Sequence, residues 1–143
     1  MWDKANGLIR FRGARHCTVR NCTFSDSGSD GVRLDLFCQE ITVEGSTFRD
    51  IGGTGILLCG YGPGNKDVNK GNTIHNNEIT RVGQLFLHSP GIFVWQSGHN
   101  RISNNHVYDQ AYTGIVVAGV RRRFFDPIFK KMGKPNPYKK WIF

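Results

Sequence analysis

The sequence predicts an all-β solenoid, a parallel stack of about four to five short coils. Glycines open short apolar segments at steps of 24, 24, 36 and 23 residues, and they are Gly7, Gly31, Gly55, Gly91 and Gly114. A second apolar segment ending in a sharp turn recurs in register with them, and no stretch keeps a helical period. A repeat of this length predicts coils that bury their apolar side chains on one another.

Within each coil, the glycine-led segment alternates in the way expected of a strand. Apolar residues two apart, such as Val32 and Leu34, point toward the core, and the residue between them points outward. The outward positions in successive copies are Arg33, Leu57, Phe93 and Val116.

The second segment recurs at residues 19–24, 43–48, 74–79 and 102–107. At the same place in each copy stands a residue that readily adopts the left-handed conformation of a sharp bend. These bend residues are Asn21, Gly45, Asn76 and Asn104. We therefore expect one bend to be reused on every coil.

The stretch from Gly91 through residues 100–109 to Val117 resembles the right-handed parallel β-helix repeat proteins of the pectate-lyase-like superfamily. The resemblance covers roughly residues 5–120. It implies a right-handed parallel β-helix, a fragment of a carbohydrate-active enzyme, and an extracellular or periplasmic location. Because the superfamily includes hydrolases, lyases and non-catalytic adhesins, function has to be argued from the site.

The domain organisation follows from the repeat and the charge. Residues 1–120 form the β-helix segment, and residues 121–143 form an irregular basic tail or the start of an insertion. No cap is visible at either end, so we expect a segment truncated from a longer parent chain. The net charge of +8 divides into +7 on the tail (eight Lys or Arg, one acid) and +1 on the body (eleven basic, ten acidic).

This charge distribution argues against nucleic acid as the partner of the body. A basic tail could bind phosphates, but it could equally pack on absent parts of the parent protein. No apolar run is long enough to span a membrane, so we expect no membrane partner. The expected partners are a polysaccharide or oligosaccharide and the rest of the parent chain.

Interruptions of the repeat locate the candidate binding face. Insertions at 60–71 and 83–90 and the tail flank the coil of Gly91, which carries Phe93 and Trp95 outward, followed by Gln96. Aromatic side chains beside polar groups suit a sugar ring. The alternative is that loops of the parent protein cover these rings.

The candidate catalytic groups are carboxylates at one corner of the coil. Asp26, Asp50 and Asp109 occupy equivalent positions, so Asp50 and Asp109 would lie two coil spacings, about 9.6 Å, apart. Inverting glycosidases use carboxyl pairs about 6.5–9.5 Å apart. Asp109 would act as acid or base with Asp50 or His88 as its partner. Alternatively, these side chains bond turn backbone.

The leading hypothesis is therefore a glycoside hydrolase fragment, with a polysaccharide lyase or a non-catalytic carbohydrate-binding adhesin scaffold as alternatives. Tyr112, beside Asp109, together with Arg33 and Asp35, completes the predicted substrate contacts. We predict no cofactor and no metal: the cysteines lack zinc-ligand spacing, and only Asp35 with Arg33 resembles a calcium-dependent lyase site. A Cys38–Cys59 disulfide is left open.

Overall fold

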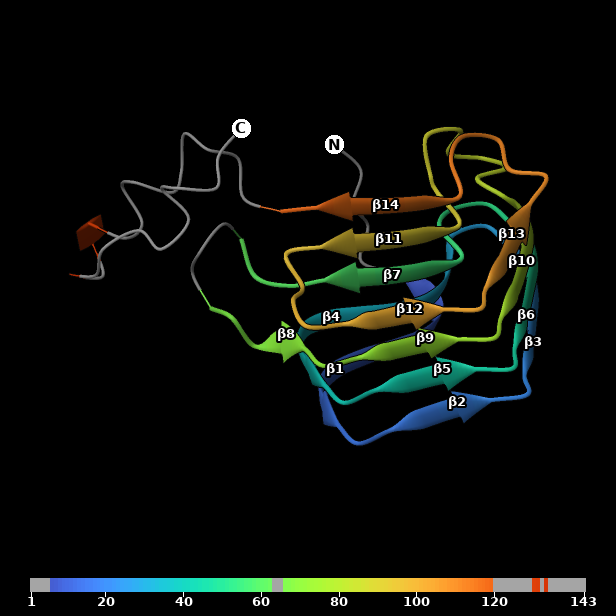
Figure 1. Ribbon diagram of the computed structural model, residues 1–143. Helices are drawn as coiled ribbons and strands as arrows, with labels where there is room; N and C mark the ends of the chain where they lie inside the picture. Colours follow the sequence, from blue (N-terminus) through green and yellow to red (C-terminus); the bar gives the residue numbers. More distant parts are fainter. Residues whose placement is uncertain (1–5, 63–65, 120–129, 132, 134–143) are drawn as a thin grey trace.

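The structure, a computed structural model, describes residues 6–62, 66–119, 130–131 and 133, and it is built from three parallel sheets (Figure 1). The first sheet contains β1 (Gly7–Arg15), β4 (Asp30–Gln39), β7 (Ile56–Cys59), β11 (Ile92–Trp95) and β14 (Ile115–Ala118), with β8 (Asn69–Lys70) paired beside β4. The second contains β2 (Thr18–Arg20), β5 (Thr42–Glu44), β9 (Thr73–His75) and β12 (Arg101–Ser103). The third contains β3 (Thr23–Ser27), β6 (Thr47–Ile51), β10 (Glu78–Val82) and β13 (His106–Tyr108).

Each coil contributes one strand to each sheet before the chain rises to the next coil, as Figure 1 shows. β1, β2 and β3 form the first coil, and β4, β5 and β6 stack on them in parallel register. β14 begins a further coil above β11. The predicted all-β solenoid of about four to five coils is confirmed.

The core is a set of apolar ladders that run along the stack. In the third sheet Phe24, Phe48, Ile79 and Val107 are register partners on successive coils. The rings of Phe24 and Phe48 stack at 4.7 Å between centroids. In the first sheet the ladders of Val32 and of Leu34 point inward, and Arg33, Leu57, Phe93 and Val116 form the predicted ladder between them.

The glycine ladder differs from the prediction at its first member. Gly7 pairs with Asp30 and Ile9 with Val32, so Leu8 stands beside Gly31 and Gly7 lies one residue out of register. At Gly31, Gly55 and Gly91 a glycine is required by close approach. A Cβ on Gly31 would lie 2.5 Å from the carbonyl oxygen of Gly55 and 2.8 Å from the Phe48 ring. Leu8, which stands beside Gly31, is 50% exposed, so the first coil accepts a side chain at this position.

The predicted bend is present on every coil. Asn21, Gly45, Asn76 and Asn104 have φ angles of 53°, 57°, 53° and 54°. The residue after each bend then builds a side-chain ladder. Ser46 accepts a bond from the Cys22 N–H at 3.1 Å through its hydroxyl oxygen, Asn77 accepts from the Ser46 N–H at 3.1 Å, and Asn105 accepts from the Asn77 N–H at 3.0 Å. Side chains thus satisfy the backbone where the sheets end.

The two insertions have different structures. The segment at 60–71 returns to the first sheet as β8, which pairs with the end of β4. The segment at 83–90 folds back over the corner of the coil below it. Its backbone N–H groups at Gly83, Gln84, Leu85 and Phe86 donate to the carbonyl groups of residues 51–53 at 2.9–3.1 Å. This second insertion is therefore held as a wall beside the first sheet.

All four cysteines are free thiols, so the Cys38–Cys59 disulfide is not formed. Within the described part of the chain, no helix is long and apolar enough to cross a membrane. The predicted basic tail, 121–143, lies almost wholly outside the described residues.

Candidate functional site

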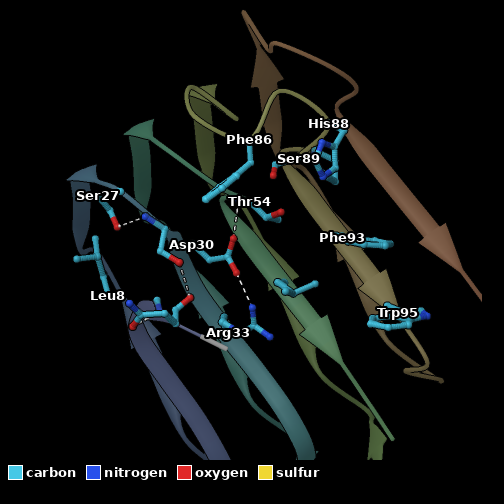
Figure 2. A pocket seen from close by; sticks show the side chains of 16 residues that line it. Leu8, Ser27, Asp30, Arg33, Thr54, Phe86, His88, Ser89, Phe93 and Trp95 are labelled. Carbon is cyan, nitrogen blue, oxygen red and sulfur yellow. Dashed lines mark hydrogen bonds and ion pairs between the residues drawn. The ribbon is translucent and has the colours of Figure 1, made fainter. Parts of the chain in front are cut away.

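A pocket of about 760 Å³ lies on the outer face of the first sheet (Figure 2). Its floor is made by outward side chains of β4, β7 and β11, which are Arg33, Leu57, Phe93 and Trp95. One wall comes from residues 6–8 and 27–30, and the opposite wall from Phe86, His88, Ser89 and Pro90 of the second insertion. The pocket therefore spans four neighbouring strands, from β1 to β11.

The aromatic end of the floor is formed by Phe93 and Trp95. They stand two residues apart on β11 and so share one face of the strand. Their rings are nearly parallel, at 10° between planes and 6.4 Å between centroids. Both are partly exposed, whereas Leu57 on the neighbouring strand is buried. This end presents apolar ring surface to a ligand.

The charged end of the floor, Asp30 and Arg33, belongs to a network of ion pairs that continues beneath the pocket lining. Asp30 accepts bonds from the Thr54 N–H at 2.7 Å and from an Arg33 terminal nitrogen at 2.8 Å. Arg33 also pairs with Asp35 at 3.2 Å, and Arg10 closes the network on the other oxygen of Asp35. The side chains of Arg33 and Asp35 are 3% and 4% exposed. The pairing offsets the cost of burying these charges, and it holds their geometry fixed.

Arg33 and Asp35 thus differ in their position relative to the pocket. Arg33 lines the pocket, as predicted for a substrate contact, whereas Asp35 is not part of the lining. Among the described residues, Asp30 is the one carboxylate that lines the pocket. Asp30 was not predicted from the sequence, although it stands directly before the repeat glycine Gly31 and three residues before Arg33.

The insertion wall supplies polar and aromatic groups. His88 is exposed at the rim, and Ser89 is buried beneath it. Ser89 donates its backbone N–H to the Phe86 carbonyl at 2.8 Å, which closes the turn that presents His88. Figure 2 shows His88 and Ser89 on the same side of the pocket as Phe86, above the strand that carries Phe93. The structure therefore brings His88 together with the predicted aromatic residues.

The predicted catalytic aspartates lie at a different corner. Asp50, near the end of β6, and Asp109, directly after β13, both have a φ angle of 54°. Arg81 occupies the equivalent position near the end of β10, on the coil between them. Arg81 binds both carboxylate oxygens of Asp50, at 2.7 and 2.8 Å, and donates its N–H to the Asp109 carbonyl at 3.1 Å. The hydrogen bond from Arg81 holds the pKa of Asp50 below its ordinary value. Neither aspartate lines the pocket.

The remaining predicted contacts also lie away from the pocket lining. Gln96 follows Trp95 with a φ of 53° and donates its N–H to the Ala118 carbonyl at 3.1 Å. Tyr112 is 62% exposed on the next corner loop. No described residue of the first insertion lines the pocket, and the second wall comes instead from residues 6–8 and 27–30.

The lining residues that were not predicted from the sequence fall into two groups. Leu8, Asp30 and Thr54 belong to regular coils, so no interruption of the repeat marked them. Phe86 and Ser89 lie in the inserted segment that was identified, and the insertion itself was their signal. In the described part of the chain, no three His, Cys, Asp or Glu side chains gather as metal ligands do.

Comparison with known proteins gives a family but no individual relative. A family model described as "Right handed beta helix region" matches residues 6–130. No curated protein and no solved structure matched the chain.

Proposed function

Since the chain belongs to the right-handed β-helix family, we propose that it is a carbohydrate-binding β-helix whose ligand is an oligosaccharide held in the pocket over β4, β7 and β11. The observation that carries the proposal is the pair of parallel, partly exposed rings of Phe93 and Trp95 on the pocket floor. The apolar face of a sugar ring packs on aromatic rings, and its hydroxyl groups need hydrogen bonds nearby.

Polar groups are available on the sides of the same pocket. His88 and Ser89 lie on one wall, and the Asp30–Arg33 pair lies at the far end of the floor (Figure 2). A volume of about 760 Å³ is within the range of small-molecule sites. The arrangement of apolar rings at one end and fixed polar groups at the other would orient a short oligosaccharide along the pocket.

Glycoside hydrolysis is supported less well than binding. The reaction needs two carboxyl groups on either side of the bond to be broken. Asp30, the one carboxylate among the described residues that lines the pocket, is engaged by Thr54 and Arg33. Asp50 and Asp109 belong to a separate corner, where Arg81 stands on the coil between them. Sugar binding without turnover is therefore the function that this geometry favours, and an extracellular or periplasmic location would suit it.

The test is a glycan-array screen of the full chain, followed by calorimetry with the best oligosaccharide. A sugar ring packed on Trp95 would cover roughly half of the indole surface, and Trp95→Ala removes that contact. We therefore expect binding to weaken by about 10- to 100-fold. Tyr112→Ala is the matched control, because this exposed aromatic residue does not line the pocket. Equal weakening by both variants, or no bound glycan, would refute the proposal. Release of shorter sugars would instead support hydrolysis.

A further inference from the structure

A second candidate site lies on the outer face of the second sheet, formed by β2, β5, β9 and β12 (Figure 1). A groove of about 380 Å³ crosses these strands. Its lining consists of Thr18, Arg20, Thr42, Glu44, Thr73, His75 and Arg101. None of these residues lines the larger pocket on the first sheet, so the groove is independent of the proposed carbohydrate site.

His75, one of the residues that line the groove, pairs with Ser103, which is not itself part of the lining. His75 on β9 and Ser103 on β12 are register partners, and the Nδ1 atom of His75 lies 3.0 Å from the Ser103 hydroxyl oxygen. Both residues are partly buried. This separation is within the range over which a histidine accepts the proton of a nucleophilic serine. The arrangement requires the tautomer that carries its hydrogen on Nε2.

A carboxylate lies on the opposite side of the histidine. Glu44 on β5 is the register partner of His75, so Glu44, His75 and Ser103 follow one another on three neighbouring strands. Strands in a sheet are about 4.8 Å apart, and side chains in register meet across that distance. The Glu44 carboxylate is bound by Arg20, which lies on the strand away from His75, so Glu44 acts on His75 by its charge across the strand spacing. The order acid, histidine, serine is that of a nucleophilic triad.

Arg101 supplies a cation on the same face of β12 as Ser103. Arg101 stands two residues before Ser103 on β12, which puts both side chains on the outer face. It pairs in register with Thr73, and both line the groove. A guanidinium group beside the serine can stabilise the oxyanion of a tetrahedral intermediate.

We propose that Ser103 and His75 form an acyl-transfer site that hydrolyses esters. The Ser103 oxygen bonds to the ester carbonyl carbon while its proton moves to Nδ1 of His75 and the carbonyl electron pair moves to oxygen. The intermediate expels the alcohol, which takes the proton from His75 and leaves an acyl group on Ser103. Water then attacks, gives a proton to His75, and releases the carboxylic acid as that proton returns to Ser103.

The groove also sets the class of ester. Its lining is made of hydroxyl-bearing and charged side chains, and no large apolar side chain contributes to it among the described residues. A long acyl chain would therefore find no apolar surface to bury on. The ligand is a short-chain ester, such as an acetyl group, on a polar alcohol that can bond the threonine hydroxyls and the arginines.

The experiment treats the full chain with a fluorophosphonate, which transfers phosphorus to an activated serine with loss of fluoride. Intact mass and peptide mapping of the wild-type protein should place one adduct on Ser103. Ser103→Ala should abolish the adduct, and His75→Gln should slow its formation by about 100-fold. Ser25→Ala, a change on an outer strand of the third sheet, is the matched control and should label like the wild type.

Hydrolysis of 4-nitrophenyl acetate provides the second measurement. Glu44 acts through His75 as a positioning residue, so Glu44→Gln should lower kcat about tenfold and leave KM unchanged. An unlabelled wild-type protein, or an adduct mapped to another residue, overturns the proposal without relying on any variant. So does a Ser103→Ala protein that hydrolyses the ester at the wild-type rate.

Discussion

Replacing Asn77 by alanine should be among the most destabilising single changes in the stack. Asn77 is 2% exposed. Its side-chain oxygen accepts the Ser46 N–H at 3.1 Å, and its amide nitrogen donates to the Val43 carbonyl at 3.0 Å and to Asn105 at 2.9 Å. Alanine would remove these partners at a position that water does not reach.

The expected cost can be built up from the groups left behind. A buried donor or acceptor that loses its partner costs about 1–3 kcal/mol. With one backbone N–H and one carbonyl affected, we expect a loss of roughly 2–6 kcal/mol in the free energy of unfolding. For a chain of this length, that corresponds to a fall in Tm of roughly 5–20 °C.

Asn105→Ala is the matched control, because Asn105 holds the same ladder position one coil further along but is only partly buried. Water can replace part of its bonding, but the two Asn77 donors that it accepts from are buried, so we expect a smaller cost than for Asn77→Ala, about 1–2 kcal/mol. Urea denaturation followed by circular dichroism gives both values. If the two substitutions cost the same, or if Asn77→Ala unfolds like the wild type, burial of the ladder is not what gives it its strength.

Three further outcomes follow from the described contacts. Burial raises the pKa of the Cys38 thiol to about 11, so a thiol reagent at pH 8 should modify exposed Cys22 in the native protein and Cys38 only after unfolding; equal rates would contradict this. Because the pKa of Asp50 is lowered by Arg81, their pairing stabilises the fold above the ordinary carboxyl pKa and is lost on acidification. Arg81→Gln should raise the Asp50 pKa in a carboxyl NMR titration, and an unchanged titration would be inconsistent with the pairing. Gly60→Ala should prevent folding or sharply lower Tm, since its methyl group would overlap the main chain of the next coil.

The architecture could be predicted from the sequence because each coil repeats the same pattern of glycine, apolar and bend residues. The bends at Asn21 and Asn76 and the ladder of Phe24 and Phe48 were predicted from residue type and spacing, and the structure confirms them. The first coil is the exception. Gly7 matches the glycine spacing, but strand pairing follows the apolar alternation and puts Ile9 opposite Val32.

The site was predicted less completely, for reasons of geometry rather than composition. Phe93, Trp95 and His88 were found because an outward ladder and an inserted segment can be located by counting residues. Counting also placed Asp50 and Asp109 on one corner correctly, with Arg81 between them. It could not show that Arg81 would take both oxygens of Asp50. Side-chain direction and ion pairing decide such matters, and a one-dimensional repeat does not specify them.

The wall that bears His88 is fixed by main-chain hydrogen bonds to residues 51–53, so its attachment does not depend on which side chains it carries. Substitutions at Phe86 or His88 would change the shape and chemistry of the pocket rim while the anchoring bonds persist. The β-helix thus separates the residues that keep the loop in place from those that meet a ligand. Ligand preference in this fold could diverge by exchanging a few rim side chains, with little cost to stability.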